Sequence, residues 1–271
     1  LICFDKDAFC SYNLKKAYNA PVSEEAATII NAALNDLIAK APIHAGTKFV
    51  HWYKEPVDKQ YDLCNLLGLG IESSDEQSNE ESSDEENEEE SINEEDEIKA
   101  LAAARRLIES VKRGENPQQL NNRYYIMSLS GAGGRIMVRS FLQGSYEDLY
   151  NSFKAWFDDL RIVSRSGKGL SRPPRLFDLY SRLLKKEKNS RSISERMGKE
   201  LSGLDSQIMY SIINNTVLPD AVAIRALAYI RSDMLDSGND NKTVKIPDTL
   251  CCQLLKAWLI RKYRNLKYKI G

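Results

Sequence analysis

Residues 123–142 read RYYIMSLSGAGGRIMVRSFL, and this stretch decides the fold of the first part of the chain. Arg123–Ser130 and Arg135–Leu142 are two alternating apolar and polar runs joined by Gly-Ala-Gly-Gly. Such runs around a glycine-rich connection predict an antiparallel β-hairpin. Alternation along the second run predicts one face with Arg135, Met137, Arg139 and Phe141 and the other with Ile136, Val138 and Leu142. The arginine-bearing face suits single-stranded nucleic acid, or equally an ordinary solvent face.

The residues around the hairpin predict further strands and helices. Leu1–Phe4 and Lys48–Tyr53 are patterned as short strands. Ser23 is placed to cap a helix that Pro42 ends, and Ser145 is placed to cap the helix that follows the hairpin. Beyond residue 173, apolar residues recur at helical spacing and no strand pattern is found. The predicted class is α+β: a small antiparallel sheet with helices in the first part, followed by an all-α helical region.

Residues 72–97 differ in composition from the rest of the chain. They hold 15 acidic residues, no basic residue and no aromatic residue. Such a segment buries too little apolar surface to offset its ordering entropy, so we expect a disordered acidic insertion. The predicted organisation is therefore an α+β domain formed by residues 1–71 and 98–163, the insertion at 72–97, and a helical region at 164–271. The insertion either occupies the basic surface of the same chain as a mimic of nucleic acid or is only a solvated loop. The second interpretation is preferred.

The composition excludes several classes of protein. No run of apolar residues is long enough for a transmembrane helix, so no membrane partner is expected. The five cysteines, of 271 residues, form no CxxC pair, which argues against a disulfide framework or a zinc site and favours the cytoplasm. The chain begins at Leu1 without a signal-peptide pattern, as expected for the middle of a longer chain.

Motifs for catalysis are absent from the sequence. Gly131–Gly134 is not followed by the Lys-Ser/Thr pair of a phosphate-binding loop and does not open a helix. His44 and His51 are the only histidines, and neither lies in a metal-binding motif; His51, beside Trp52, is interpreted as a packed residue. No catalytic residue, metal ligand or cofactor is predicted.

Basic residues are the more informative signal. Taking the 15 acidic residues of the insertion from the total of 39 leaves 24, against 38 basic residues. This excess, with its concentration in residues 161–191 and at the C-terminus, indicates a nucleic-acid partner or, alternatively, a solvated helix face. The candidate nucleic-acid contacts are Arg135, Arg139, Arg161, Arg165, Lys168, Arg172, Arg175, Arg261, Lys262 and Arg264.

Several blocks of the sequence, in order, resemble the Csd family, the large subunit of the type I-C CRISPR Cascade complex. These blocks are Asn19–Ser23, Phe49–Trp52, Arg123–Leu129, Arg135–Arg139, Pro219–Asp233 and Lys256–Arg261. The three glycines of the hairpin turn and the long acidic run depart from the family pattern. Family members are also longer, so the resemblance implies that this chain is the middle portion of such a subunit.

The resemblance implies a non-catalytic component of an RNA-guided DNA surveillance complex in antiviral defence. The implied partners are the Cascade backbone and small subunits, target DNA and the recruited helicase–nuclease. Two other classes of function stay open. A metal-dependent nuclease would need a cluster of carboxylates. A protein-only interaction scaffold would leave the charged surfaces without a nucleic-acid partner.

Overall fold

The computed structural model describes residues 22–67, 94–115, 119, 121–132, 135–164, 167, 169–171, 174–185, 192–236 and 247–264. The predicted strand at Leu1–Phe4 and most of the predicted insertion at 72–97 lie outside these residues. The chain divides into two compact units, Leu1–Lys40 and Ala41–Gly271. In the first unit, helix α1 (Glu24–Lys40) begins as predicted, because the Ser23 hydroxyl accepts the Ala26 N–H at 3.1 Å.

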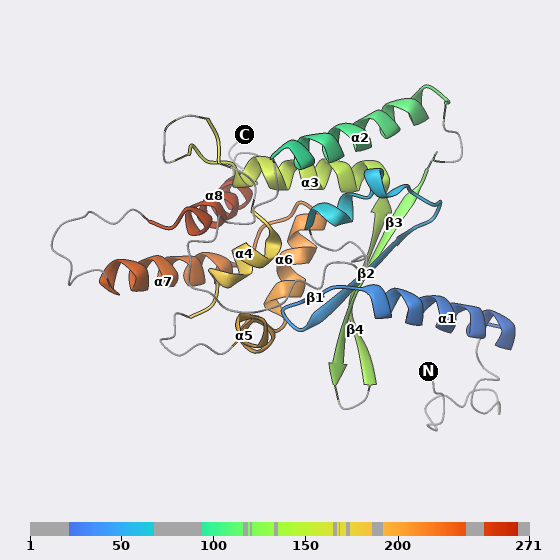
Figure 1. Cartoon of the computed structure of the whole chain (residues 1–271), viewed down its shortest axis with the longest axis horizontal. Coiled ribbons are helices and arrows are strands. Elements are labelled where there is room, and N and C mark those ends of the chain that lie inside the picture. Colours follow the sequence, from blue (N-terminus) through green and yellow to red (C-terminus); the bar gives the residue numbers. More distant parts are fainter. Residues whose placement is uncertain are drawn as a thin grey trace. The chain divides into compact units, whose positions relative to one another are not determined.

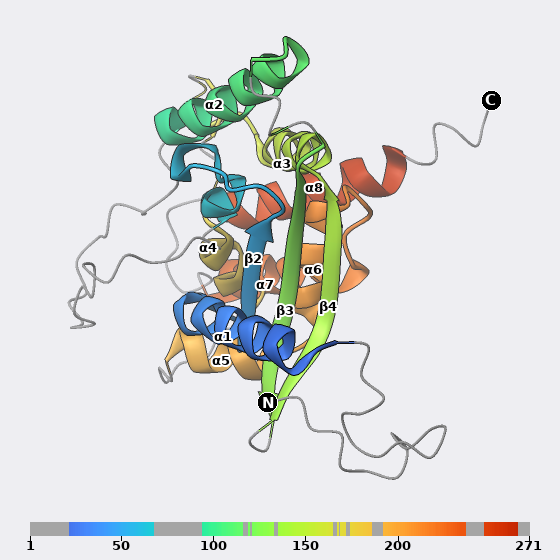
Figure 2. The same cartoon turned by 90° about the vertical axis from the view of Figure 1, so that its right-hand side faces the viewer.

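The second unit contains a four-stranded antiparallel sheet in the order β1-β2-β3-β4. The strands are β1 (Ile43–His44), β2 (Thr47–Tyr53), β3 (Arg123–Ala132) and β4 (Arg135–Ser145). The predicted hairpin of β3 and β4 is confirmed, and β2 pairs along the other edge of β3. The fold class is therefore α+β, as the sequence predicted. Figures 1 and 2 show that the helices α3, α6 and α8 lie on one side of this sheet.

A β-bulge in β4 corrects the predicted faces of the hairpin. Ser128 pairs with Ser140 and Leu129 pairs with Val138, so Arg139 is an extra residue in its strand. A slip of one residue moves every later side chain to the other face of a sheet. Leu142 is consequently buried, whereas Ile136 and Val138 are each 59% exposed. The predicted grouping of these three residues on one face is wrong, because alternation does not reveal a bulge.

Gly144 of β4 packs directly against a tyrosine side chain of β3. It faces Tyr124, whose ring is buried at 3% exposure. A Cβ atom at residue 144 would lie 2.7 Å from Tyr124 Cε1 and 2.9 Å from its hydroxyl oxygen. The tyrosine ring therefore occupies the space that any larger residue at 144 would need.

We expect Gly144→Val to lower the free energy of unfolding by about 1–3 kcal/mol, the usual cost of overpacking a buried site. Urea denaturation of the variant and the parent chain measures this difference. Gly131→Val is the matched control, because a Cβ at Gly131 of β3 meets no atom within 4 Å. Equal losses in the two variants would show that the Tyr124 contact is not the cause.

The described helices of the second unit include the helix predicted after the hairpin and helices in the region predicted to be helical beyond residue 173, but no apolar pattern predicted the helix Ile193–Glu200. They are α2 (Glu94–Lys112), α3 (Tyr146–Leu160), α4 (Leu176–Ser181), α5 (Ile193–Glu200), α6 (Leu204–Ile213), α7 (Asp220–Asp236) and α8 (Thr249–Arg264), with the 3-10 helices η3 (Lys59–Tyr61) and η4 (Leu63–Leu67). Helix α2 begins at Glu94, so the last four residues of the insertion predicted at 72–97 are helical. These four residues are acidic, and negative charge is favoured at a helix N-terminus.

Within the described residues, no helix has the length and apolar character needed to span a bilayer.

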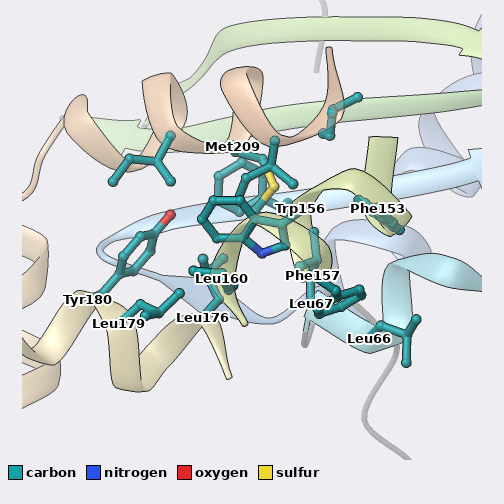
Figure 3. Packing of buried hydrophobic residues seen from close by; sticks show 14 of the residues in the cluster. Leu66, Leu67, Phe153, Trp156, Phe157, Leu160, Leu176, Leu179, Tyr180 and Met209 are labelled. Carbon is teal, nitrogen blue, oxygen red and sulfur yellow. The ribbon is translucent and has the colours of Figure 1, made fainter. Parts of the chain in front are cut away.

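One buried cluster joins the sheet to the helices. It includes Phe49 of β2, Ile126 of β3, Phe153 and Trp156 of α3, and Met209 of α6. Figure 3 shows Trp156 among the labelled residues, with Met209 on one side and Leu160 and Leu176 on the other. The cluster extends across the boundary predicted between residues 163 and 164. That boundary remains a prediction.

Candidate nucleic-acid interface

Six of the ten candidate contacts have described side chains. Arg165, Lys168 and Arg172 lie outside the described residues, and only the backbone of Arg135 is described, at the start of β4. The candidates Arg165 and Lys168 are flanked in the sequence by Val163 and Leu170, which form an isolated antiparallel bridge at the base of a predicted basic loop. The loop predicted to carry phosphate contacts is thus closed at its base by backbone pairing.

Three further candidates are paired with carboxylates, and the fourth lies at the start of α4. Arg161 donates to Asp158 Oδ1 at 2.8 Å, and Lys262 lies 3.0 Å from Asp220 Oδ1. Arg264 donates to Asp159 Oδ1 at 2.5 Å. Arg175 is exposed at the N-cap of α4. The pairs of Arg161 and Lys262 are partly exposed, whereas Asp159, the partner of Arg264, is buried.

Arg261 has a different environment from the other candidates. Its side chain is 1% exposed, and its Nε donates to Asp159 Oδ2 at 2.8 Å. One terminal nitrogen also donates to the carbonyl oxygens of Ser211 and Thr216, and the guanidinium lies over the Trp156 ring at 5.2 Å. This cation is held in the core, so we remove Arg261 from the proposed contact set.

Arg139 is the candidate that the structure places beside a cavity. It lies at the β-bulge of the edge strand β4, and its Nε donates to the Ser130 hydroxyl at 2.7 Å. No carboxylate pairs with Arg139 among the residues that the structure describes. A guanidinium that has only a hydroxyl partner at an exposed position keeps most of its capacity to bind an anion.

The cavity next to Arg139 lies between β4 and α6 and has a volume of about 440 Å³; we refer to it as the β4–α6 cavity. Its lining includes Ser206, Gln207, Tyr210 and Thr216. None of the described lining residues is acidic, and Tyr210 is 49% exposed. A cation, hydroxyl and amide groups, and an accessible aromatic ring together match the phosphate, sugar and base of a nucleotide in a single strand.

Sequence reasoning found Arg139 but not the rest of this cavity. Tyr210 and Gln207 belong to α6, and helical spacing of apolar residues beyond residue 173 indicates only the buried side of such a helix. No spacing rule relates these residues to β4, because the two elements are about seventy residues apart in sequence. The only available signal was the combination of arginine with apolar residues in residues 135–141.

The comparison with protein families identifies the chain's relatives. The family model described as CRISPR-associated protein (Cas_Csd1) matches residues 1–270. The chain belongs to the Cas_Csd1 family. The match covers nearly the whole chain, so it includes both the hairpin with Arg139 and the C-terminal helices. It confirms the family resemblance found in the sequence. No protein among the curated sequences matches this Csd1 chain.

Proposed function

We propose that this Csd1 chain is a non-catalytic part of the large subunit of a type I-C Cascade complex, where it binds target DNA and supports recruitment of the helicase–nuclease in antiviral defence. The family match supports the CRISPR association. In guided effectors of this kind, base pairing with the guide RNA reads the sequence, and the protein holds the nucleic-acid backbone. We further propose that the chain works in the cytoplasm, where it contacts the Cascade backbone and small subunits.

The observation that carries the DNA-binding part of the proposal is the position of Arg139 at the β4–α6 cavity. Its guanidinium can form charge-assisted hydrogen bonds with a phosphate. Tyr210, on the opposite wall, can stack on a base, and the hydroxyls of Ser206 and Thr216 can contact the sugar. Stacking and phosphate contacts do not distinguish one base from another, so the proposed interface is independent of sequence.

We propose a role without a catalytic step because the described lining of the cavity holds no histidine, cysteine or carboxylate that would activate a nucleophile or hold catalytic metal ions. A nuclease of the two-metal type holds its ions with carboxylates that line the site. The described lining of the cavity contains none. A measurement of magnesium-dependent cleavage by the assembled complex without its helicase–nuclease tests this part: cleavage would contradict it.

We expect Arg139→Ala to weaken binding of single-stranded DNA to the assembled complex about tenfold, which corresponds to about 1.4 kcal/mol. The dependence of log affinity on log salt should flatten by up to about 0.7, because one phosphate contact to a single strand is lost. Fluorescence anisotropy on two unrelated DNA sequences measures both effects, which should be similar for the two.

Arg105→Ala is the matched control for this experiment. Arg105 is also an exposed arginine, but its Nε is paired with Glu109 at 2.8 Å. We expect its replacement to leave the affinity within about twofold of the parent, since a neutralised surface pair attracts phosphate weakly. A loss confined to one DNA sequence, or an equal loss in both variants, would contradict a general phosphate contact at Arg139.

A further inference from the structure

A second group of polar side chains lies between β2 and the segment that follows it, away from the β4–α6 cavity. His51 is on β2, while Asp62 and Cys64 are on the segment that contains η3 and η4. His51 Nε2 lies 2.9 Å from Asp62 Oδ2. The Tyr53 hydroxyl donates to Asp62 Oδ1 at 2.8 Å and lies 3.8 Å from Cys64 Sγ. We call these residues the His51 cluster.

The His51 cluster is shielded from solvent. The side chains of His51 and Asp62 are 8% and 16% exposed, and Cys64 is completely buried. Burial raises the pKa of Asp62, but hydrogen bonds from His51, Tyr53 and the Cys64 N–H outweigh this effect and leave it lowered. Asp62 is therefore a carboxylate that accepts several hydrogen bonds beside a histidine and a thiol.

The donor atoms of the cluster have the types and spacing of a metal site. One atom each from His51, Asp62 and Cys64 lies within 4.8 Å of the other two. An imidazole nitrogen, a carboxylate oxygen and a thiolate sulfur are the three ligand types that zinc accepts in proteins. We propose that His51, Asp62 and Cys64 bind one divalent zinc-type ion, with the Tyr53 hydroxyl beside the fourth coordination position.

The charge balance of this site favours a divalent ion that accepts sulfur. A thiolate and a carboxylate together neutralise two positive charges, so the loaded site adds no net charge to a buried region. Binding releases the Cys64 thiol proton to solvent, as metal binding by cysteine generally requires. Magnesium and calcium prefer all-oxygen ligands, so the mixed donor set selects against them.

Bound metal would fix the segment 59–67 against β2. This segment supplies Leu63, Leu66 and Leu67 to the buried cluster of the fold. Without metal, the hydrogen bonds of Asp62 with His51 and Tyr53 and the hydrogen bond from the Tyr146 hydroxyl to the Tyr61 carbonyl oxygen tie this segment to the rest of the fold. Sequence patterns missed the site because the ligands come from a strand and a 3-10 segment eleven residues apart, with no paired cysteines.

The test is a titration of the full metal-free chain with cobalt(II) chloride, followed by absorption spectroscopy. We expect one cobalt ion per chain and a near-ultraviolet sulfur-to-cobalt charge-transfer band, which zinc should abolish by displacing cobalt. Cys64→Ser should lose the band. His51→Gln and Asp62→Asn should weaken binding at least about tenfold, as even the loss of an outer-shell partner of a metal ligand commonly does.

Cys251→Ser is the matched control, because Cys251 is also a free, fully buried cysteine but lies on α8. It should keep the band and the stoichiometry. If Cys64→Ser does not fold, X-ray absorption of the zinc-loaded parent chain replaces it, with one sulfur ligand expected. A parent chain without the charge-transfer band, a band that persists in Cys64→Ser, or a zinc shell of nitrogen and oxygen alone would overturn the proposal and leave a purely hydrogen-bonded cluster.

Discussion

Asp159→Ala is expected to lower the free energy of unfolding by about 3–5 kcal/mol, the usual cost of removing one partner of a buried ion pair. Asp159, near the end of α3, is 3% exposed and accepts hydrogen bonds from Arg261 and Arg264 of α8. Burial lowers the pKa of Arg261, and the Asp159 carboxylate opposes that effect. Without Asp159, the Arg261 guanidinium would remain charged and buried without a compensating charge.

Two comparisons show whether the uncompensated charge causes this loss. Lys262→Ala removes the neighbouring cation of α8, whose exposed partner is Asp220, and we expect a change of at most about 1 kcal/mol. Asp159→Leu combined with Arg261→Met replaces both charges by apolar groups and should recover most of the stability. Urea denaturation measures each variant. A double variant as unstable as Asp159→Ala would indicate that lost packing, not the unpaired charge, is responsible.

The role of Arg261 shows where sequence reasoning ends for this chain. Its pattern, a basic residue near the end of a helix, is shared with Lys262 and Arg264, and charge alone places all three at a surface. The burial of the Arg261 side chain depends on its ion pair with Asp159, which precedes Arg261 by 102 residues in the sequence. Only the packing of α3 against α8 decides which of the three cations turns inward.

Sequence patterns predicted the local structure correctly where neighbouring residues determine it. The Ser145 hydroxyl caps α3 by accepting the Asp148 N–H at 3.1 Å, as the capping pattern predicted. The presence of the hairpin and the class of the fold followed from alternation and glycine content in the same way. The β-bulge at Arg139, the β4–α6 cavity and the His51 cluster did not, because each depends on how distant segments pair or pack.

Trp156→Ala is expected to lower the free energy of unfolding by about 3–5 kcal/mol, because it opens a large cavity in the core. Trp156 is 1% exposed and lies among residues from several helices (Figure 3). Lys154→Ala, an exposed change on the same helix, should stay within about 0.5 kcal/mol of the parent. A small effect of Trp156→Ala would mean that the helices close around the missing side chain.

The same variant tests the domain boundary predicted between residues 163 and 164. Phe49 and Ile126 of the sheet share one buried cluster with Met209 and Leu254 of the helical region. We therefore expect one cooperative transition for the second unit, shifted to lower urea by Trp156→Ala with its slope unchanged. Hydrogen exchange should report the same loss of protection in β3 and in α6. If β3 keeps its protection while α6 loses it, the helices unfold independently of the sheet, and the predicted boundary separates two folding units.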